Sequence, residues 1–449
     1  MNCLNSPAQP PCDDSAPSAV CGARLPAWLL PHDWPRDPRR RSAPALARIE
    51  LADGRIAGVR PEPAEAVEAP DAASAWNARG APVLPGLVEA HTHLDKAFTL
   101  GRMGTVRPGL LGAIDALIED RARWTDADIR ARATRGLQWS WEAGTTHLRT
   151  HVDWFNGAIP PPAWGVLSTL AHEWRDRLAI ELAALAPLRF FADAAQAGKL
   201  ARHAASTGPH ARLGGFVHTS NWDTVALRHL VTAAADAGID LDLHVDEELD
   251  PGAQGLATIA QLARETGFAG RIVCGHVCAL AAMPEAQALV VLDAVARAPI
   301  TLVSLPVTNL LLQDAGTHRT PRQRGITLVK EARARGIPLL FASDNVQDPF
   351  CRTGSLDPVE TMAVATWAAQ LDAPFDTWSD SICRADWLQR QHATRPSIEG
   401  APADLVIFPD ADATGWPSRT ARRQVLRAGR LLRSVPAATP TDSGALAPA

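Results

Sequence analysis

The chain contains almost no lysine. Lys96, Lys199 and Lys330 are the only lysines among its 44 basic residues, and the others are arginines. The formal net charge is −5 at pH 7, and the longest run of basic residues is 39–41. Because a protein that binds nucleic acid needs a concentrated positive surface, this charge pattern argues against nucleic acid as a partner.

Long apolar runs and paired cysteine motifs are also missing. No segment reaches the roughly 20 consecutive apolar residues of a membrane span, and the first residues lack the basic start and apolar run of a signal peptide. The seven cysteines include no Cys-x-x-Cys motif, so a disulfide framework is not expected. These absences predict a cytoplasmic protein that spans no membrane.

The two ends of the chain differ in composition from its middle. Residues 1–20 are rich in proline, serine and aspartate, residues 436–449 have a similar composition, and both are predicted to be disordered tails. Short apolar runs broken by turn signals fill residues 21–82 and return at 400–435, a pattern typical of short strands. We therefore predict one small, β-sandwich-like domain built from both chain ends.

Residues 83–399 alternate apolar, strand-like runs with longer alanine-rich stretches of helical spacing. Hydrophobic residues make up 46% of the chain, which is enough for a large core. The strand-like runs lie at 83–91, 145–152, 178–186, 212–217, 240–245, 271–276, 300–305 and 337–343. Eight strand-then-helix units over about 300 residues are typical of an α/β fold of the (β/α)8 TIM-barrel type.

Side chains that bind metals lie at the carboxyl ends of four of these runs. His91 and His93 end the first run, two residues apart, so both point to one side of the strand. His244, His276 and Asp344 end the fifth, sixth and eighth runs. Taken singly, His276 also fits a core histidine and Asp344 a helix N-cap. Their coincidence at the face where barrel enzymes carry their active sites favours a nitrogen and oxygen site for zinc or ferrous iron.

With their flanking sequences, these residues resemble the amidohydrolase superfamily. Residues 84–95, Leu-Pro-Gly-Leu-Val-Glu-Ala-His-Thr-His-Leu-Asp, look like its first-strand motif. The cytosine deaminase branch, and N-isopropylammelide amidohydrolase with it, is similar in the segments 149–153, 244–247, 274–276, 306–313, 324–331 and 343–349. The resemblance implies a metal-dependent hydrolase acting on non-peptide carbon–nitrogen bonds.

The resemblance implies one divalent metal ion, either zinc or iron(II). Its ligands would be His91, His93, His244 and Asp344. Two-metal members of the superfamily bridge their ions with a modified lysine or a carboxylate on a middle strand. Lys199 is the only lysine between residues 97 and 329 and lies in a helix-like stretch, while Glu181 lies too early in its run. We therefore expect a single metal.

Three residues are predicted to be catalytic. By resemblance, Glu247 would shuttle protons to a ring nitrogen and the leaving group, and His276 would orient the attacking hydroxide. Asp344 could take a proton from water while still touching the metal, because a divalent ion makes its bound water acidic. The alternative for Glu247 is a solvated loop carboxylate. On the second run, Arg149, His151 and Asp153 could support the metal ligands.

Five residues are candidates for binding the substrate, and two of them depart from cytosine deaminase. Leu188 replaces a glutamine that reads the pyrimidine edge, and Asn345 replaces an aspartate that contacts the amino group. Cytosine itself is therefore not expected to be the substrate. Lys96 either meets an anionic group or pairs with an acid at the barrel rim. Phe350 matches an aromatic that packs on the substrate or belongs to the core, and Gln313 lies in a family motif.

The sequence thus predicts a mononuclear enzyme that hydrolytically deaminates a cytosine-like or related nitrogen heterocycle. One alternative is hydrolysis of an N-substituted amine or cyclic amide, such as a triazine. Another is a non-catalytic binding protein on the same fold. The expected partner is a small heterocyclic molecule, and we also consider a homo-oligomer.

Overall fold

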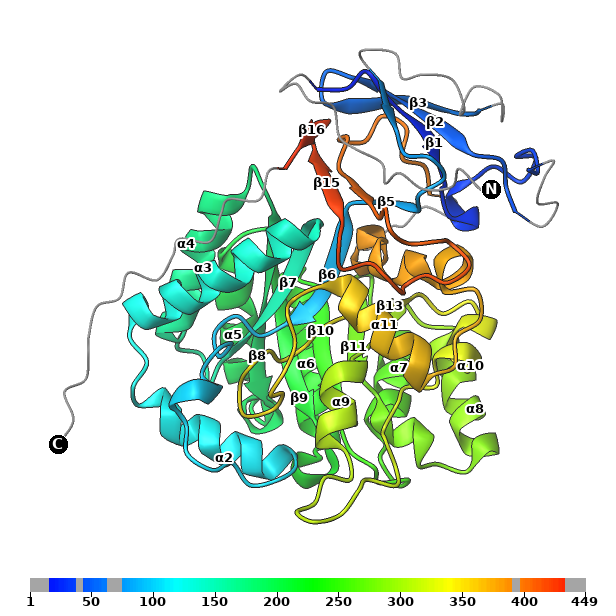
Figure 1. Cartoon of the computed structure of the whole chain (residues 1–449). Helices are drawn as coiled ribbons and strands as arrows, with labels where there is room; N and C mark the ends of the chain where they lie inside the picture. Colours follow the sequence, from blue (N-terminus) through cyan, green and yellow to red (C-terminus); the bar gives the residue numbers. More distant parts are fainter. Residues whose placement is uncertain (1–15, 38–42, 63–74, 390–395, 433–449) are drawn as a thin grey trace.

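The structure, a computed structural model, describes residues 16–37, 43–62, 75–389 and 396–432 (Figure 1). Its centre is one sheet of eight parallel strands in the order β13-β12-β11-β10-β9-β8-β7-β6. The strands are β6 (Leu87–Thr92), β7 (Thr145–Asp153), β8 (Ala179–Pro187), β9 (Ala211–Val217), β10 (Leu241–Val245), β11 (Ile272–His276), β12 (Ile300–Ser304) and β13 (Leu339–Phe341). A parallel bridge between Thr92 and Asp344 joins the first strand to the last, which confirms the predicted barrel.

Helices follow the strands and surround the barrel (Figure 1). They are α2 (Leu110–Arg121), α3 (Asp126–Ala143), α4 (Pro162–Trp174), α5 (Ala194–Ser206), α6 (Thr224–Ala237), α7 (Gly255–Glu265), α8 (Glu285–Val295), α9 (Pro306–Leu312), α10 (Val329–Ala334) and α11 (Pro358–Ala368). Aspartate caps start several of them; the Asp223 carboxylate, for example, accepts hydrogen bonds from the backbone N–H groups of Val225 and Ala226. No helix of the described residues is long and apolar enough to cross a membrane.

The first predicted run, 83–91, is divided into two strands. Strand β5 (Val83–Pro85) ends at a proline, and β6 starts after Gly86. A Cβ atom on Gly86 would lie only 2.4 Å from Cγ2 of Thr146, so the chain can pass here only without a side chain. Strand β5 pairs with β14 (Leu405–Ile407) outside the barrel, while β6 pairs with β7.

Two small four-stranded sheets lie together beside the barrel (Figure 1). One has the order β3-β2-β1-β4 and the other β16-β15-β14-β5. The remaining bounds are β1 (Ala19–Ala23), β2 (Ala47–Ala52), β3 (Arg55–Pro61), β4 (Ala75–Asn77), β15 (Gln424–Arg427) and β16 (Arg430–Leu431). Ile49 and Trp76 of the first sheet share a buried cluster with Leu405 and Leu426 of the second, so residues from both chain ends pack against each other.

Residues 1–15 and 436–449, which make up most of the two predicted tails, lie outside the described residues. Strand β1 begins at Ala19, inside the segment predicted as the first tail. It pairs with β2 and β4, so residues 19 and 20 belong to a sheet.

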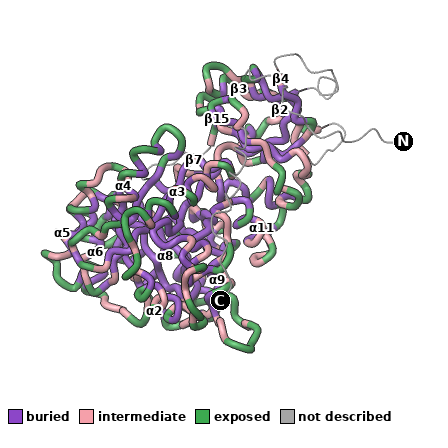
Figure 2. The backbone as a smooth tube through the Cα atoms, turned by 60° about the vertical axis from the view of Figure 1, so that its left-hand side comes forward, coloured by how far each residue is buried: buried purple, intermediate pink, exposed green. Residues whose placement is uncertain are grey.

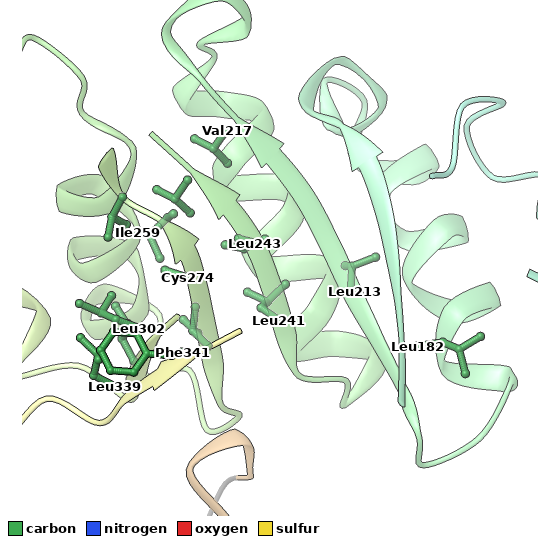
Figure 3. Packing of buried hydrophobic residues seen from close by; sticks show 14 of the residues in the cluster. Leu182, Leu213, Val217, Leu241, Leu243, Ile259, Cys274, Leu302, Leu339 and Phe341 are labelled. Atoms are coloured by element: carbon green, nitrogen blue, oxygen red, sulfur yellow. The ribbon is translucent and has the colours of Figure 1, made fainter. Parts of the chain in front are cut away.

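The main core lies between the barrel strands and the helices. Leu213, Leu241, Leu243, Leu302 and Phe341 point from the strands into this layer (Figure 3). All five are essentially inaccessible to solvent, and burial of each leucine stabilises the fold by roughly 1.5–3 kcal/mol. In Figure 2 the buried backbone follows these strands, while exposed residues are concentrated in the outer loops.

The interior of the barrel is packed with side chains. Val88, Val273, Val303 and Leu340 form a second cluster there, together with Trp387 of the 3-10 helix η8 (Ala385–Leu388).

Candidate metal centre

The backbone at the strand ends directs the polar side chains toward one place. Val88 and Ala90 belong to the interior cluster, whereas His91 and His93 lie at the mouth. The pairing of β6 with β7 shifts its register between Glu89 and Thr92, an irregularity of the kind that re-aims side chains at barrel rims.

A residue with a left-handed backbone ends β11 and another lies three residues after β13. The φ angles of His276 and Asp344 are 69° and 64°, a conformation that costs non-glycine residues energy and that occurs often at functional sites. The backbone of Asp344 is held on both sides: its N–H donates to the carbonyl of His91 at 2.9 Å, and its carbonyl accepts from Thr92 Oγ1 at 2.8 Å.

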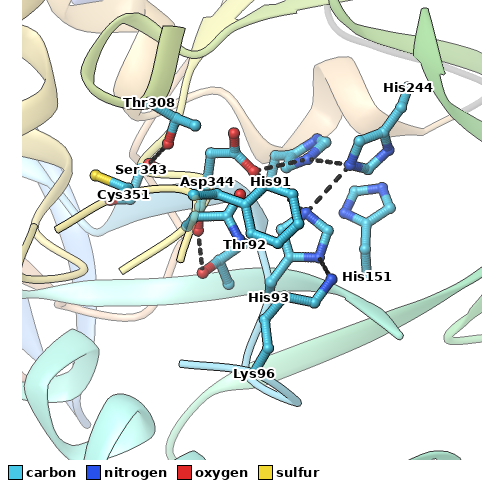
Figure 4. Close-up of polar contacts among 12 residues, drawn as sticks. His91, Thr92, His93, Lys96, His151, His244, Thr308, Ser343, Asp344 and Cys351 are labelled. Atoms are coloured by element: carbon cyan, nitrogen blue, oxygen red, sulfur yellow. Dashed lines mark hydrogen bonds and ion pairs between the residues drawn. The ribbon is translucent and has the colours of Figure 1, made fainter. Parts of the chain in front are cut away.

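Four of the predicted residues bring their donor atoms together (Figure 4). Nε2 of His244 lies 3.2 Å from Nε2 of His91 and 3.1 Å from Nε2 of His93. Oδ1 of Asp344 lies 3.5 Å from Nε2 of His91 and 3.2 Å from Nε2 of His93. Ligands of a tetrahedral zinc ion at its usual bond lengths are roughly 3.3 Å apart, so these separations fit a single divalent ion.

The charges of three of these residues also suit a cation. Burial lowers the pKa of His93 and of His244 well below the ordinary value, which leaves nitrogen lone pairs free. Burial alone would raise the pKa of Asp344, but the adjacent His91 and His93 hold it well below its usual range. Neither carboxylate oxygen of Asp344 has a hydrogen-bond partner among the described residues, as expected for atoms that bind an ion.

His276 and Glu247 lie beside this group. The donor atoms of His91, His244, His276 and Asp344 all lie within 4.8 Å of one another. Nδ1 of His276 lies 3.4 Å from Oε1 of Glu247, and burial lowers the pKa of His276 to about 3. Burial, together with Asp344, raises the pKa of Glu247 well above its ordinary value. Glu247 is thus a buried acid rather than a solvated loop carboxylate.

A buried polar group beneath the centre contains two of the residues predicted to support it. The ring of His151 lies 3.9 Å from that of His91, and its Nε2 contacts Oδ1 of Asp242 at 3.0 Å. Arg149 donates to Asp242 at 2.6 Å and to Glu181 at 2.7 Å. Sequence reasoning missed Asp242, although its position two residues before His244 places both on one strand face.

Lys96 pairs with an acid, which is one of the two alternatives considered for it. Its Nζ lies 2.8 Å from Oδ2 of Asp153 and 3.1 Å from Nδ1 of His93. Burial opposes the charge, but Asp153 and Asp95 raise the pKa of Lys96 above its ordinary value. Lys96 also lies 5.7 Å from the centre of the Phe350 ring.

The other candidates for substrate binding contact the protein in different ways. Asn345 donates to Oδ2 of Asp348 at 2.6 Å, and Gln313 donates to the carbonyl of Glu247 at 3.3 Å. Leu188 is fully buried in the main core, and Phe350 is half-buried. Sequence reasoning assigned no role to Asp348, although it lies in the motif 343–349.

A barrel with buried histidines and an aspartate gathered at the carboxyl ends of its strands is an arrangement that metal-dependent hydrolases use. Residues 171–433 match the model of the Amidohydrolase family. The chain is also 37% identical, over 401 residues, to the pterin deaminase of Rhizobium rhizogenes strain K84, covering 87% of this chain and 89% of that protein. The chain therefore belongs to the amidohydrolase family, and the prediction of a hydrolase for carbon–nitrogen bonds is confirmed.

Two further proteins are similar over much of the chain. The N-isopropylammelide isopropyl amidohydrolase of Pseudomonas sp. strain ADP is 27% identical over 310 residues, covering 66% of this chain and 71% of that protein. The crystal structure of 5-methylcytosine deaminase from Klebsiella pneumoniae, liganded with 5-fluorocytosine, superposes with a TM-score of 0.74 at 23% identity, covering 93% of this chain and 98% of that one. The likeness to this deaminase structure supports the fold of the chain.

Proposed function

We propose that this protein is a metal-dependent aminohydrolase that removes an amino group from a pterin-like nitrogen heterocycle as ammonia. The observation that carries the proposal is the convergence of three imidazole nitrogens and one carboxylate oxygen beside a buried acid, Glu247, whose pKa is raised by burial. The identity with the pterin deaminase over most of both chains supports this class of substrate.

His91, His93, His244 and Asp344 would hold one zinc or iron(II) ion. When bound, such an ion polarises water and lowers its pKa from 15.7 to roughly 7. The described part of the chain places no lysine among these ligands, because Lys96 contacts His93 through Nδ1 and pairs with Asp153. That arrangement supports a single ion.

Glu247 and Asp344 would transfer the protons of the reaction, and His276 would orient the attacking water. Water adds its oxygen to the ring carbon that carries the amino group, and that carbon becomes tetrahedral. Asp344 would take one proton from that water, and Glu247, whose raised pKa favours the protonated form, would give its proton to the adjacent ring nitrogen. The Glu247 carboxylate would then take up the remaining hydroxyl proton and pass it to the departing amino group, so that the carbon–nitrogen bond breaks, ammonia leaves and a carbonyl remains. The proton held by Asp344 would restore the acid form of Glu247. Acid–base help of this kind contributes typically ~10² to 10⁴ in rate.

The substrate-binding roles of Leu188, Asn345, Phe350, Gln313 and Lys96 remain part of the proposal. An apolar Leu188 cannot read a pyrimidine edge by hydrogen bonding, so cytosine is not the expected substrate. The identity with the N-isopropylammelide isopropyl amidohydrolase favours a second candidate, hydrolysis of an N-alkyl amine on a triazine. A cytoplasmic location and self-association also stay predictions.

A substrate panel with two product assays tests the proposal. The purified protein, analysed for zinc and iron, is incubated with pterins, aminopurines, aminopyrimidines and N-alkylated triazines. Ammonia release from a pterin, with loss of its amino group by mass spectrometry, is the expected result. Release of an alkylamine without ammonia would favour the second candidate. A protein that contains no metal and acts on no compound would revive the non-catalytic alternative.

A further inference from the structure

Asn309 is a buried amide that contacts His276 and that the proposed chemistry does not use. It lies in the short helix α9, after strand β12, and only 1% of it is exposed. Its Nδ2 lies 3.1 Å from Nδ1 of His276. Its backbone is fixed as well, because its N–H donates to the carbonyl of Leu305 and its carbonyl accepts from the N–H of Gln313.

The contact with Asn309 determines which ring nitrogen of His276 carries hydrogen. A neutral imidazole has one N–H group and one lone pair. The amide nitrogen of Asn309 can only donate, so Nδ1 of His276 must offer its lone pair and the hydrogen must lie on Nε2. Nε2 has no hydrogen-bond partner among the described residues, and His276 lies within the group formed with His91, His244 and Asp344.

We propose that Asn309 is a positioning residue that fixes His276 in the tautomer with hydrogen on Nε2, so that His276 presents an N–H group to the metal centre instead of a lone pair. The proposal rests on the proposed function, because it assumes an ion at the centre. It divides the work between the proposed ligands, which bind the ion, and His276, which donates a hydrogen bond.

The surroundings of His276 are consistent with this division. The Glu247 carboxyl lies farther from Nδ1, at 3.4 Å, than the Asn309 amide does at 3.1 Å. The carbonyl of His276 accepts from Thr327 Oγ1 at 2.8 Å, so the residue is held from its backbone too. The imidazole ring therefore has little freedom to rotate so that Nδ1 and Nε2 exchange places.

The substitution Asn309→Asp tests the proposal with almost no change in shape. A carboxylate accepts instead of donating, so it should move the hydrogen of His276 to Nδ1. The measurement is the ¹H–¹⁵N spectrum of metal-free protein labelled with ¹⁵N-histidine, in which His276 is assigned by comparison with His276→Gln. Hydrogen on Nε2 in the parent and on Nδ1 in Asn309→Asp is expected. Hydrogen on Nδ1 in the parent, or the same tautomer in both proteins, would overturn the proposal.

A control and a second readout separate a specific effect from a general one. Asn345→Ala removes another buried amide near the centre, one that contacts Asp348, and should leave the His276 tautomer unchanged. In Asn309→Asp the free Nε2 lone pair adds a donor, so zinc affinity should rise on the order of tenfold, the scale of effects from residues that orient metal-binding histidines. An unchanged zinc affinity would contradict the proposal. Because the tautomer is read without substrate, its failure is distinguishable from failure of the proposed activity.

Discussion

The pKa values of the two acids that lie nearest the chemistry are shifted in opposite directions. Burial, together with the nearby Asp344, raises the pKa of Glu247 and favours its protonated form, although Lys96 acts in the opposite direction. Asp344 is equally buried, but His91 and His93 stabilise its anion and lower its pKa. Two carboxyl groups with pKa values moved apart by their surroundings can act as proton donor and metal-binding anion at the same pH.

Glu247→Gln should therefore retain the metal and lose most of the turnover. The amide keeps the shape of the side chain but cannot give up a proton, so kcat/KM should fall by ~10² to 10⁴. Metal content and ammonia release are the measurements. Glu248→Gln is the matched control, because Glu248 contacts the backbone of Thr219 instead of the centre. If Glu247→Gln turned over substrate at the parent rate, Glu247 would not be the proton donor.

Glu89 should make stability depend on pH. It is fully buried behind Asp344, accepts hydrogen bonds from the N–H and Oγ of Ser343, and burial raises its pKa from 4.5 to about 7. Between these values the folded protein holds a proton that the unfolded chain has lost, so stability falls as pH rises. The amide of Glu89→Gln does not lose a proton, so this pH dependence of the stability is absent from the variant.

Urea unfolding of the metal-free protein at pH 5 and pH 8 measures this effect. Between the two pH values, the free energy of unfolding of the parent should fall by roughly 3 kcal/mol more than that of Glu89→Gln. This difference corresponds to the shift in the pKa of Glu89 between the unfolded and the folded protein. Glu142→Gln, at an exposed position, should follow the parent at both. If the free energies of unfolding of Glu89→Gln and of the parent changed equally with pH, Glu89 would be ionised in the folded protein.

Among the elements, the break between β5 and β6 has a simple steric cause that can be tested. Gly86→Ala should destabilise the fold by ~1 to 3 kcal/mol, because its Cβ would overlap Thr146. Adding Thr146→Ala removes the two nearest atoms and should recover part of the loss. Gly165→Ala in α4 is the control, since no atom lies within 4 Å of its added Cβ and alanine favours helices. Thermal unfolding measures all four proteins; equal losses for Gly86→Ala alone and with Thr146→Ala would contradict the steric account.

The sequence predicts the elements better than their contacts. Each of the eight apolar runs contains a strand of the barrel, because strand length and alternation with helices are local properties. The pairing of Lys96 with Asp153 was one of two open alternatives, since 57 residues separate the two and only closure of the barrel brings them together. The contact of Asn309 with His276 was not predicted for the same reason.

The metal centre joins distant parts of the whole molecule. Its proposed ligands lie on or just after β6, β10 and β13, which are the first, fifth and last strands of the barrel. An ion that binds only the folded protein therefore stabilises the entire barrel, by ~4.1 kcal/mol at a free concentration of 1,000 times Kd.

Thermal unfolding of chelator-treated protein with and without zinc checks this stabilisation. The Tm of the parent should rise with zinc concentration. His91→Ala should bind zinc more weakly and show a much smaller rise. An equal rise in both proteins would place the zinc elsewhere.

The most direct test of the central claim is a metal titration of ammonia release. Chelator-treated protein receives increasing equivalents of zinc or iron(II), and ammonia formed from the best substrate of the panel is measured at each ratio. The account predicts no activity without metal, a linear increase, and a plateau at one equivalent. A plateau at two equivalents, or activity that does not depend on added metal, would contradict a single-ion centre formed by His91, His93, His244 and Asp344.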